Sequence, residues 1–168
     1  YVGCFSIIAS RLVGSKGKVI AFEPDNVSYR KLLANLELNK IDNVLAINKG
    51  VFDKDSKIKF FGRTSRGSSF VFESDIPTKN IDVCKLDTII KELNLIPNFI
   101  KMDVEGSELY VLKGAKELLK NHKINLAIAT YHIINNKTTD LDVENYLQRL
   151  GYKTFTGFLK HRVTYAWK

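Results

Sequence analysis

The feature of this sequence that most constrains its fold is an alternation of short apolar runs with longer amphipathic stretches. Residues 18–22 (KVIAF) form an apolar run that is typical of a strand covered on both faces. Apolar residues then recur at helical spacing over residues 29–36, and Asp25 or Asn26 is expected to cap that helix. Because strands that alternate with helices through short connections form mostly parallel sheets, the pattern predicts a doubly wound α/β fold.

The alternation continues to the end of the chain. We expect further helices over residues 5–12, 87–93 (capped by Asp87), 107–119 and 141–150, and further strands over residues 44–48, 99–103 and 125–130. The last two apolar runs, residues 153–158 and 163–167, are joined too tightly for a crossover helix. These two strands must therefore be antiparallel.

Residues 53–86 depart from this alternation. Runs rich in β-forming residues at 57–61, 69–72 and 81–86 are broken by Gly62, Gly67 and Pro77. They predict an antiparallel, β-rich insert of about residues 53–86 within the α/β pattern. A chain of 168 residues suits one hydrophobic core, so residues 1–168 are expected to form a single domain.

The composition is that of an ordinary soluble protein, with 45% hydrophobic and 26% charged residues. No apolar run is long enough to cross a bilayer. Cys4 and Cys84 lie far apart without the spacing of metal ligands, which fits buried thiols in a cytoplasmic protein, and the sequence contains no convincing metal cluster. The net charge of +8 comes from scattered lysines and arginines rather than from a basic run, so a solvated surface is favoured over a nucleic-acid interface.

Parallel α/β sheets bind ligands at the carboxyl ends of their strands, and two informative residues are expected in that region. Gly3 precedes the first helix, where a glycine allows close approach of the backbone to a ligand. Glu23 lies 20 residues later, directly after a strand. This spacing is typical of nucleoside-binding folds, in which the acid accepts hydrogen bonds from the ribose hydroxyls. The structural alternatives are a packing glycine and a surface carboxylate.

A second group of candidates follows the strand at residues 99–103. Lys101, Asp103 and Glu105 alternate along the chain, which would place them on one face of the strand. A lysine in a strand covered on both faces is costly unless it is paired, and the two carboxylates are its expected partners. His132 follows the next strand and would serve as a general base or a substrate contact. The structural alternatives are an ion pair and a histidine that only packs.

Several short motifs of this chain occur in a fixed order. They are residues 2–3 (VG), 17–24 (GKVIAFEP), Asn35, Leu38, Asn39, 43–44 (NV), 100–108 (IKMDVEGSE) and 111–115 (VLKGA). In this order and spacing, from residue 1 to about His132, they resemble the motifs of the FkbM family of methyltransferases. The resemblance implies a mostly parallel, seven-strand methyltransferase sheet whose last strand is antiparallel. It also implies S-adenosylmethionine as cofactor and, usually, a hydroxyl oxygen as methyl acceptor.

The resemblance also implies roles for individual residues. Gly3 would line the methionine part of the cofactor, Glu23 would hold the ribose, and the loop after Asn48 would approach the adenine. Asp103 would face the transferred methyl group.

The acceptor side of the reaction is a hypothesis built on the same residues. We expect Asp103 or His132 to take or orient the proton of the acceptor, while Lys101 keeps Asp103 ionised and fixed in direction. The insert at residues 53–86 is expected to line the acceptor pocket.

The sequence departs from the family pattern in two places. The first strand of the family and the start of its glycine motif would lie upstream of Tyr1, so we expect the natural chain to continue in that direction. Residues 127–132 lack the acid that the family often carries shortly before the histidine.

Three other functions are compatible with parts of this pattern. An NAD-dependent dehydrogenase shares the spacing of Gly3 and Glu23, but the antiparallel final strands argue against it. An RNA methyltransferase would suit the positive charge, but the Asn-Pro-Pro-aromatic motif of many base-modifying enzymes is missing. A non-catalytic nucleotide-binding module of the same fold would bind cofactor without turnover. The expected partner is therefore a small-molecule, glycan or lipid hydroxyl acceptor, with nucleic acid less favoured.

Overall fold

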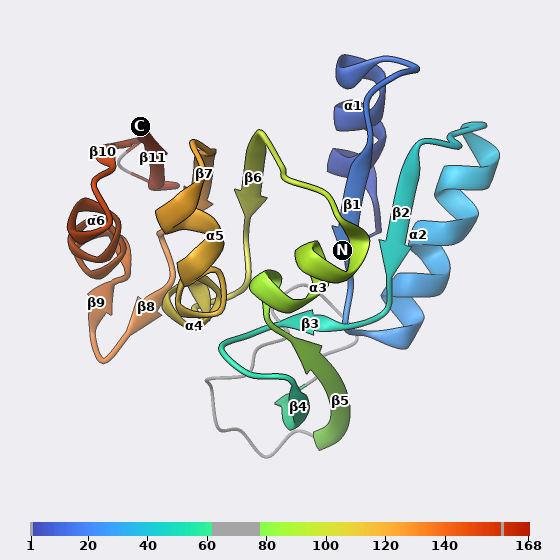
Figure 1. Cartoon of the computed structure of the whole chain (residues 1–168). Coiled ribbons are helices and arrows are strands. Elements are labelled where there is room, and N and C mark those ends of the chain that lie inside the picture. The colour runs from blue at the N-terminus through green and yellow to red at the C-terminus, as the bar shows by residue number, and fades with distance from the viewer. Residues whose placement is uncertain (1, 62–77, 159) are drawn as a thin grey trace. The chain divides into compact units, whose positions relative to one another are not determined.

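The computed structural model describes residues 2–61, 78–158 and 160–168 (Figure 1). The chain divides into two compact units, one of residues 1–50 with 81–83 and the other of residues 51–80 with 84–168. The strand expected at residues 69–72 and the breaks expected at Gly62, Gly67 and Pro77 lie outside the described residues. That residues 1–168 form a single domain stays a prediction.

The first unit contains two parallel strands, each followed or preceded by a helix. Its elements are α1 (Cys4–Val13), β1 (Val19–Phe22), α2 (Asn26–Leu38) and β2 (Val44–Ile47), drawn in blue to cyan in Figure 1. Strands β1 and β2 pair in parallel along their whole length. The Asp25 carboxylate accepts hydrogen bonds from the backbone N–H groups of Val27 (3.1 Å) and Ser28 (2.9 Å). Asp25 is therefore the N-cap of α2, one of the two caps expected from the sequence.

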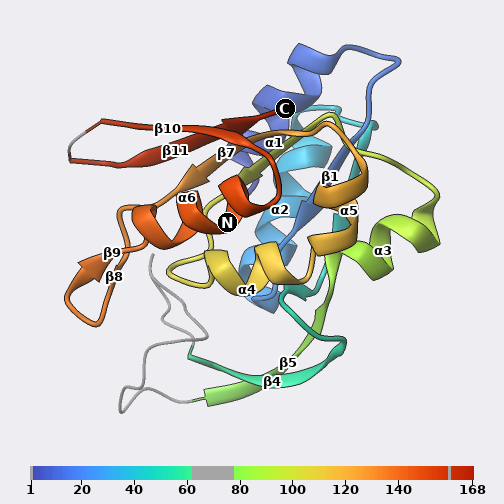
Figure 2. The same cartoon turned by 60° about the vertical axis from the view of Figure 1, so that its left-hand side comes forward.

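The second unit is built on a four-stranded sheet in the order β10-β11-β7-β6. Strands β6 (Phe99–Met102) and β7 (Asn125–Ala129) are parallel. Strand β11 (Val163–Trp167) is antiparallel both to β7 and to β10 (Lys153–Gly157), and Figure 2 shows β10 and β11 as a pair of adjacent strands. The antiparallel pairing expected for the last two strands is confirmed.

The described residues of this second unit form four helices: α3 (Leu86–Leu93), α4 (Glu108–Lys113), α5 (Lys116–Asn121) and α6 (Asp140–Arg149). Several side chains of these helices and of β7 are fully buried, namely Leu112, Leu119, Ile128, Val143 and Leu147. Each such side chain stabilises the fold by about 1.5–3 kcal/mol relative to an exposed one. In the described part of the chain, no helix is both long and apolar enough to span a membrane.

The single seven-stranded sheet implied by the resemblance is not confirmed. The described residues form smaller sheets, including β1-β2, β10-β11-β7-β6 and β3-β5-β4. The last of these consists of β3 (Gly50–Val51), β4 (Ser56–Phe61) and β5 (Thr78–Cys84). Strands β4 and β5 lie within the expected insert, and the β-rich insert as a whole stays a prediction. Among the described strands, β1 is hydrogen-bonded to β2 alone and β6 to β7 alone, so these pairs remain in separate sheets.

The structure contains a short hairpin between β7 and α6 that was not expected from the sequence. It consists of β8 (Ile133–Ile134) and β9 (Lys137–Thr138), which pair antiparallel. The two residues between them, Asn135 and Asn136, have φ values of 50° and 62°. Two successive left-handed residues are what a two-residue hairpin turn requires, and asparagine adopts this conformation more readily than most residues. The two adjacent asparagines could have indicated this turn from the sequence.

The prediction of a single helix over residues 107–119 is wrong. Helix α4 ends at Lys113 and α5 begins at Lys116, with Ala115 between them at φ −113°. The Gly114 carbonyl accepts a hydrogen bond from the Asp87 backbone N–H (3.0 Å), and a Cβ on Gly114 would collide with the Phe52 carbonyl oxygen. The break therefore lies where two backbone segments approach too closely for any side chain.

The prediction that Asp87 caps α3 is also wrong. The N-cap of α3 is Lys85, which makes no side-chain cap hydrogen bond, and Asp87 is the second residue of the helix. The Asp87 carboxylate instead accepts hydrogen bonds from the backbone N–H groups of Glu117 (3.0 Å) and Leu118 (2.8 Å), in the first turn of α5. Asp87 thus caps a helix that lies 30 residues away in the sequence.

Replacing Asp87 with alanine should destabilise the protein by about 1 kcal/mol, because two first-turn N–H groups of α5 lose their acceptor. Differential scanning calorimetry would record this loss as a lower Tm. Glu92→Ala is the matched control, since it removes an exposed carboxylate from the same helix α3. Equal Tm values for the two variants would show that Asp87 does not stabilise α5.

Candidate functional site

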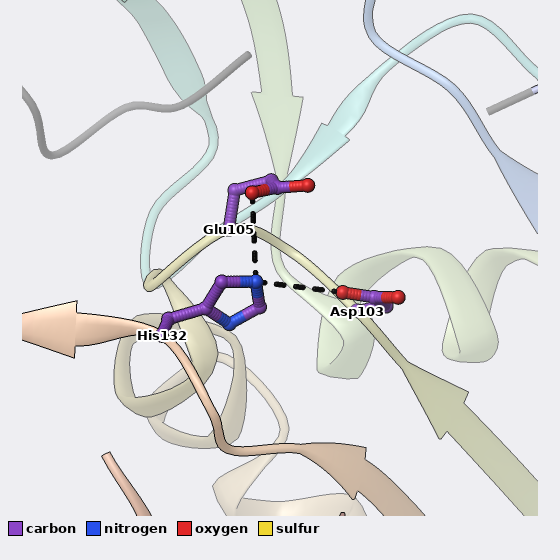
Figure 3. Close-up of side chains that lie close together, drawn as sticks. All are labelled: Asp103, Glu105 and His132. Carbon is purple, nitrogen blue, oxygen red and sulfur yellow. Dashed lines mark ion pairs between the residues drawn. The ribbon is translucent and has the colours of Figure 1, made fainter. Parts of the chain in front are cut away.

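Three of the polar residues singled out in the sequence lie together at the carboxyl ends of β6 and β7. Because these strands are parallel, their carboxyl ends lie at the same edge of the sheet. Asp103 and Glu105 follow β6, and His132 follows β7. Figure 3 shows the three side chains converging: the His132 Nε2 atom lies 3.6 Å from Asp103 Oδ1 and 3.5 Å from Glu105 Oε2.

A tight turn after β6 positions the two acidic residues. Strand β6 ends at Met102, so the strand alternation that was expected to align Glu105 with Lys101 and Asp103 stops before it reaches Glu105. Glu105 and Gly106 instead have φ values of 52° and 93°, in the left-handed region. The turn, rather than the pleat of a strand, directs Glu105 toward His132.

Glu108, the first residue of α4, is a part of this site that the sequence analysis did not single out. Its Oε1 atom lies 2.9 Å from His132 Nδ1 and accepts a hydrogen bond from the Gly106 backbone N–H (3.1 Å). Glu108 is fully buried, and only 6% of the His132 side chain is exposed. The available signal was its place in the residue 100–108 motif, three residues after Glu105. We call Asp103, Glu105, Glu108 and His132 the acid–histidine cluster.

The His132 ring is buried with unused hydrogen-bonding capacity. Among the described residues, neither ring nitrogen has a well-aligned hydrogen bond, and the same holds for Glu108 Oε2 and Ser107 Oγ. The Nδ1 contact with Glu108 is close in distance but is an ion-pair contact rather than an aligned hydrogen bond. Buried polar atoms without partners are uncommon in folded proteins and often belong to functional sites.

Asp103 is held from two further sides. Lys101 Nζ lies 3.2 Å from Asp103 Oδ2, and the Tyr131 hydroxyl donates a hydrogen bond to Asp103 Oδ1 (3.2 Å). The expected pairing of Lys101 is therefore present. The prediction that Lys101 is buried is wrong, because about a third of each side chain of the pair is exposed (34% for Lys101 and 33% for Asp103). An ion pair this exposed contributes less than about 1 kcal/mol, so its main effect is to fix the direction of the carboxylate.

The cluster favours positive charge on His132. Burial lowers the pKa of His132, but the contact with Glu108, followed by the negative charges of Glu105 and Asp103, more than offsets this and raises the pKa above its ordinary value. Burial, followed by the opposing effect of His132 and the repulsion from Asp103, leaves the pKa of Glu105 raised. Burial and the neighbouring Asp103 raise the pKa of Tyr131 to about 12, so its hydroxyl stays protonated and can donate.

The residues expected to bind a cofactor lie in the first unit. Glu23 directly follows β1 and is 7% exposed, and its Oε1 atom accepts a hydrogen bond from the Asp25 backbone N–H (2.9 Å). Asn48 directly follows β2, and its side-chain amide donates a hydrogen bond to the Glu23 carbonyl (2.8 Å). The structure thus brings Glu23 and Asn48 together at the carboxyl end of the β1-β2 pair.

Gly3 occupies the position that the sequence suggested, at the start of a helix. It is the N-cap of α1 with φ 94°, a left-handed conformation that favours glycine. A Cβ on Gly3 would lie 2.5 Å from Leu32 Cδ1, but that atom ends a flexible side chain, so the backbone angle is what selects glycine. The backbone angle accounts for the glycine without a ligand, and a ligand-binding role for Gly3 stays a prediction.

The comparison with protein families decides the classification of the chain. The methyltransferase FkbM domain matches residues 2–154, which is most of the sequence. The chain belongs to the FkbM methyltransferase domain family. The resemblance described from the sequence is thereby confirmed.

Similar individual proteins support this classification. The crystal structure of methyltransferase FkbM from Methylobacillus flagellatus KT superposes with a TM-score of 0.70 and 26% identity, covering 99% of this chain and 41% of that one. A curated relative, the "Probable cobalt-precorrin-6B C(15)-methyltransferase (decarboxylating)" of Sulfurisphaera tokodaii, is 30% identical over 125 residues, or 68% of this chain. The FkbM-domain chain therefore spans 65% of the length of that relative and less than half of the Methylobacillus structure.

A more distant structure shares the fold. The precorrin-6y C5,15-methyltransferase of Geobacter metallireducens GS-15 superposes with a TM-score of 0.59 and 13% identity, covering 99% of this chain and 76% of that one. At this identity the likeness shows the fold alone. The α/β methyltransferase fold expected from the sequence is confirmed at this level.

The acid–histidine cluster predicts a specific titration behaviour for His132. In buffer containing EDTA, its ring should titrate above the ordinary value of about 6.5, and Glu108→Gln should lower this pKa. Nuclear magnetic resonance of the imidazole protons measures it, since the chain has only three histidines to assign. Glu117→Gln, which removes an exposed carboxylate from α5, is the control and should leave the His132 pKa unchanged.

The same shift predicts how stability depends on pH. Because the folded-state pKa of His132 is raised, the stabilisation from its protonated ring is fully present below the unfolded value and is lost as pH rises through the folded value. Glu108→Gln should therefore lower the free energy of unfolding more at a pH below the ordinary histidine value than at a pH above the folded-state pKa of His132. Chemical denaturation at both pH values measures the difference. A His132 pKa at or below its ordinary value would contradict the assigned electrostatics.

Proposed function

We propose that this FkbM-domain chain acts in an S-adenosylmethionine-dependent O-methyltransferase whose acceptor is a hydroxyl group of a small molecule, glycan or lipid. One observation carries the proposal. In a chain of this family, a buried histidine and two carboxylates converge at the carboxyl edge of a parallel strand pair, where α/β folds bind their ligands.

The residues of the first unit fit the cofactor by their chemistry. A buried carboxylate at the end of β1 is suited to accept hydrogen bonds from ribose hydroxyls, and Asn48 holds the backbone of that residue. Gly3 at the start of α1 leaves the helix N-terminus without a side chain in front of it. We propose that Glu23 holds the ribose, that Gly3 lines the methionine part and that the loop after Asn48 approaches the adenine. S-adenosylmethionine, when bound, supplies an electrophilic methyl group.

The residues of the second unit fit an acceptor hydroxyl. Asp103 is exposed enough to meet a ligand, while Lys101 and Tyr131 hold its two oxygens. In this proposal Asp103 orients the acceptor hydroxyl toward the methyl group, and Asp103 or His132 receives its proton. Lys101 is a positioning residue for Asp103. Alignment of the acceptor is the main contribution that the protein makes to a displacement of this type.

The assignment of Glu23 predicts a loss of cofactor affinity. Glu23→Gln keeps an oxygen for the Asp25 N–H but loses the charge and one acceptor, so it should weaken S-adenosylmethionine binding by about 2 kcal/mol, as should Glu23→Ala. Isothermal titration calorimetry on the full-length protein measures this. Glu37→Gln, an exposed acid on α2, is the control. Unchanged affinity in both Glu23 variants would remove Glu23 from the cofactor site.

The assignment of Asp103 predicts a loss of turnover without a loss of cofactor. Asp103→Asn keeps the size of the side chain and removes its charge, so kcat should fall by roughly a hundredfold while cofactor affinity stays nearly unchanged. Methyl transfer from labelled cofactor to candidate hydroxyl acceptors measures kcat. If Asp103→Asn retains full activity while His132→Ala loses it, the proton acceptor is His132. Full activity in both variants would overturn the roles proposed for the acceptor side.

Analysis of the methylated product shows which atom receives the methyl group. The curated relative carries the name of a C(15)-methyltransferase, a carbon-methylating activity of that protein. A methyl group on oxygen and one on carbon differ clearly in carbon-13 chemical shift, so labelled product separates the two. A carbon-bound methyl group in the product would overturn O-methylation while leaving methyl transfer intact.

A further inference from the structure

We infer that Asp103, Glu105 and His132 form a binding site for a divalent first-row transition-metal cation. The ligand atoms of these residues, one from each side chain, all lie within 4.8 Å of one another. Two of the three separations involve His132 Nε2, at 3.6 Å from Asp103 Oδ1 and 3.5 Å from Glu105 Oε2 (Figure 3). The binding site stands on this geometry alone, whereas the use of the cation in catalysis rests on the proposed methyl transfer.

The separations suit one shared cation. Nitrogen and carboxylate ligands bind such a cation at about 2.0–2.2 Å, which places neighbouring ligand atoms about 3.0–3.5 Å apart. The two measured separations from Nε2 are already close to this range. The carboxylates of Asp103 and Glu105 are a third or more exposed, so small side-chain rotations can bring the third separation into range.

The histidine is an independent indication that a ligand binds here. A group of exposed acidic residues occurs often without a cation, but His132 is 94% buried, given the 6% exposure of its side chain. Its Nε2 atom faces the two carboxylates without a well-aligned hydrogen bond among the described residues. The lone pair of a neutral imidazole at this atom would be directed at the position of the shared cation.

Glu108 supports the ring in the way that metal-binding histidines are usually supported. Ligating histidines almost always place their other ring nitrogen against a carboxylate or a carbonyl, which fixes the tautomer and the ring orientation. Glu108 Oε1 lies 2.9 Å from His132 Nδ1 and is itself held by the Gly106 N–H. This leaves Nε2 as the coordinating atom, so Glu108 is a positioning residue of the site.

The ligand set indicates which cations would bind. One imidazole nitrogen with two carboxylates suits Mn²⁺, Fe²⁺, Co²⁺ or Zn²⁺ better than Ca²⁺ or Mg²⁺, which prefer oxygen ligands alone. Three protein ligands leave at least one coordination position open. If the proposed methyl transfer holds, an acceptor oxygen in that position would be more acidic. With Asp103 and His132 bound to the cation, its proton would pass to water instead of to either of them.

Binding of Mn²⁺ tests the site without reference to catalysis. The full-length protein is freed of metal with EDTA and desalted, and the free Mn²⁺ signal is followed by electron paramagnetic resonance as protein is added. We expect saturable binding that Zn²⁺ displaces. Asp103→Asn, Glu105→Gln and His132→Gln should each weaken it by at least tenfold, and Glu108→Gln by about tenfold.

Two controls match the ligand variants. His122→Gln and Asp142→Asn replace a histidine and an exposed acid outside the acid–histidine cluster and should leave Mn²⁺ affinity unchanged. Circular dichroism checks the folding of each variant. Because Asp103 and Glu105 are partly exposed, their variants should stay folded and keep the test decisive even if His132→Gln does not.

The outcomes separate this inference from the proposed function. Absence of saturable Mn²⁺ and Zn²⁺ binding, or affinity that is unchanged in folded Asp103→Asn and Glu105→Gln, overturns the cation site even if the protein transfers methyl groups. Saturable binding that is lost in those variants and retained in the controls supports the site even if no hydroxyl acceptor is methylated.

Discussion

The buried contact between Glu108 and His132 is the interaction on which the rest of the candidate site depends. It joins the first turn of α4 to the segment after β7, so it ties together the polar residues that follow two parallel strands. Glu108 is fully buried and accepts a hydrogen bond from the Gly106 N–H, and its Oε1 atom lies 2.9 Å from His132 Nδ1. With Nδ1 beside Glu108, the Nε2 atom of the ring faces Asp103 and Glu105.

The turn that precedes Glu108 has an energetic cost. Glu105 adopts φ 52°, and a left-handed conformation costs a residue other than glycine about 1–2 kcal/mol. A glycine in its place would remove the strain but also the carboxylate that faces His132. Strain of this kind persists where the surrounding structure fixes the backbone, and it is concentrated at functional sites. The adjoining Gly106, at φ 93°, completes the turn without such a cost.

Local patterns predicted the elements of this chain, and long-range contacts explain the errors. Asp25 was recognisable as a cap because it bonds to the helix that follows it, whereas Asp87 was misassigned because its partners lie 30 residues away. The break at Gly114 results from a contact with Phe52, which periodicity does not encode. At the site, the strand ends were enough to propose Asp103 and His132. Glu108 was missed because its role depends on burial against His132, which becomes visible only in three dimensions.

The negative charge around His132 can be neutralised in two ways, by a proton on the ring or by a divalent cation. Three carboxyl groups contact the ring, and Lys101 pairs with one of them. These four groups together carry two net negative charges when all three carboxyl groups are ionised. A proton on His132 balances only one of these charges, and it occupies the nitrogen that faces Asp103 and Glu105. A divalent cation balances both and uses that nitrogen as a ligand. Because bringing charge into a half-buried site is unfavourable unless it is matched, the arrangement favours the divalent cation over the proton.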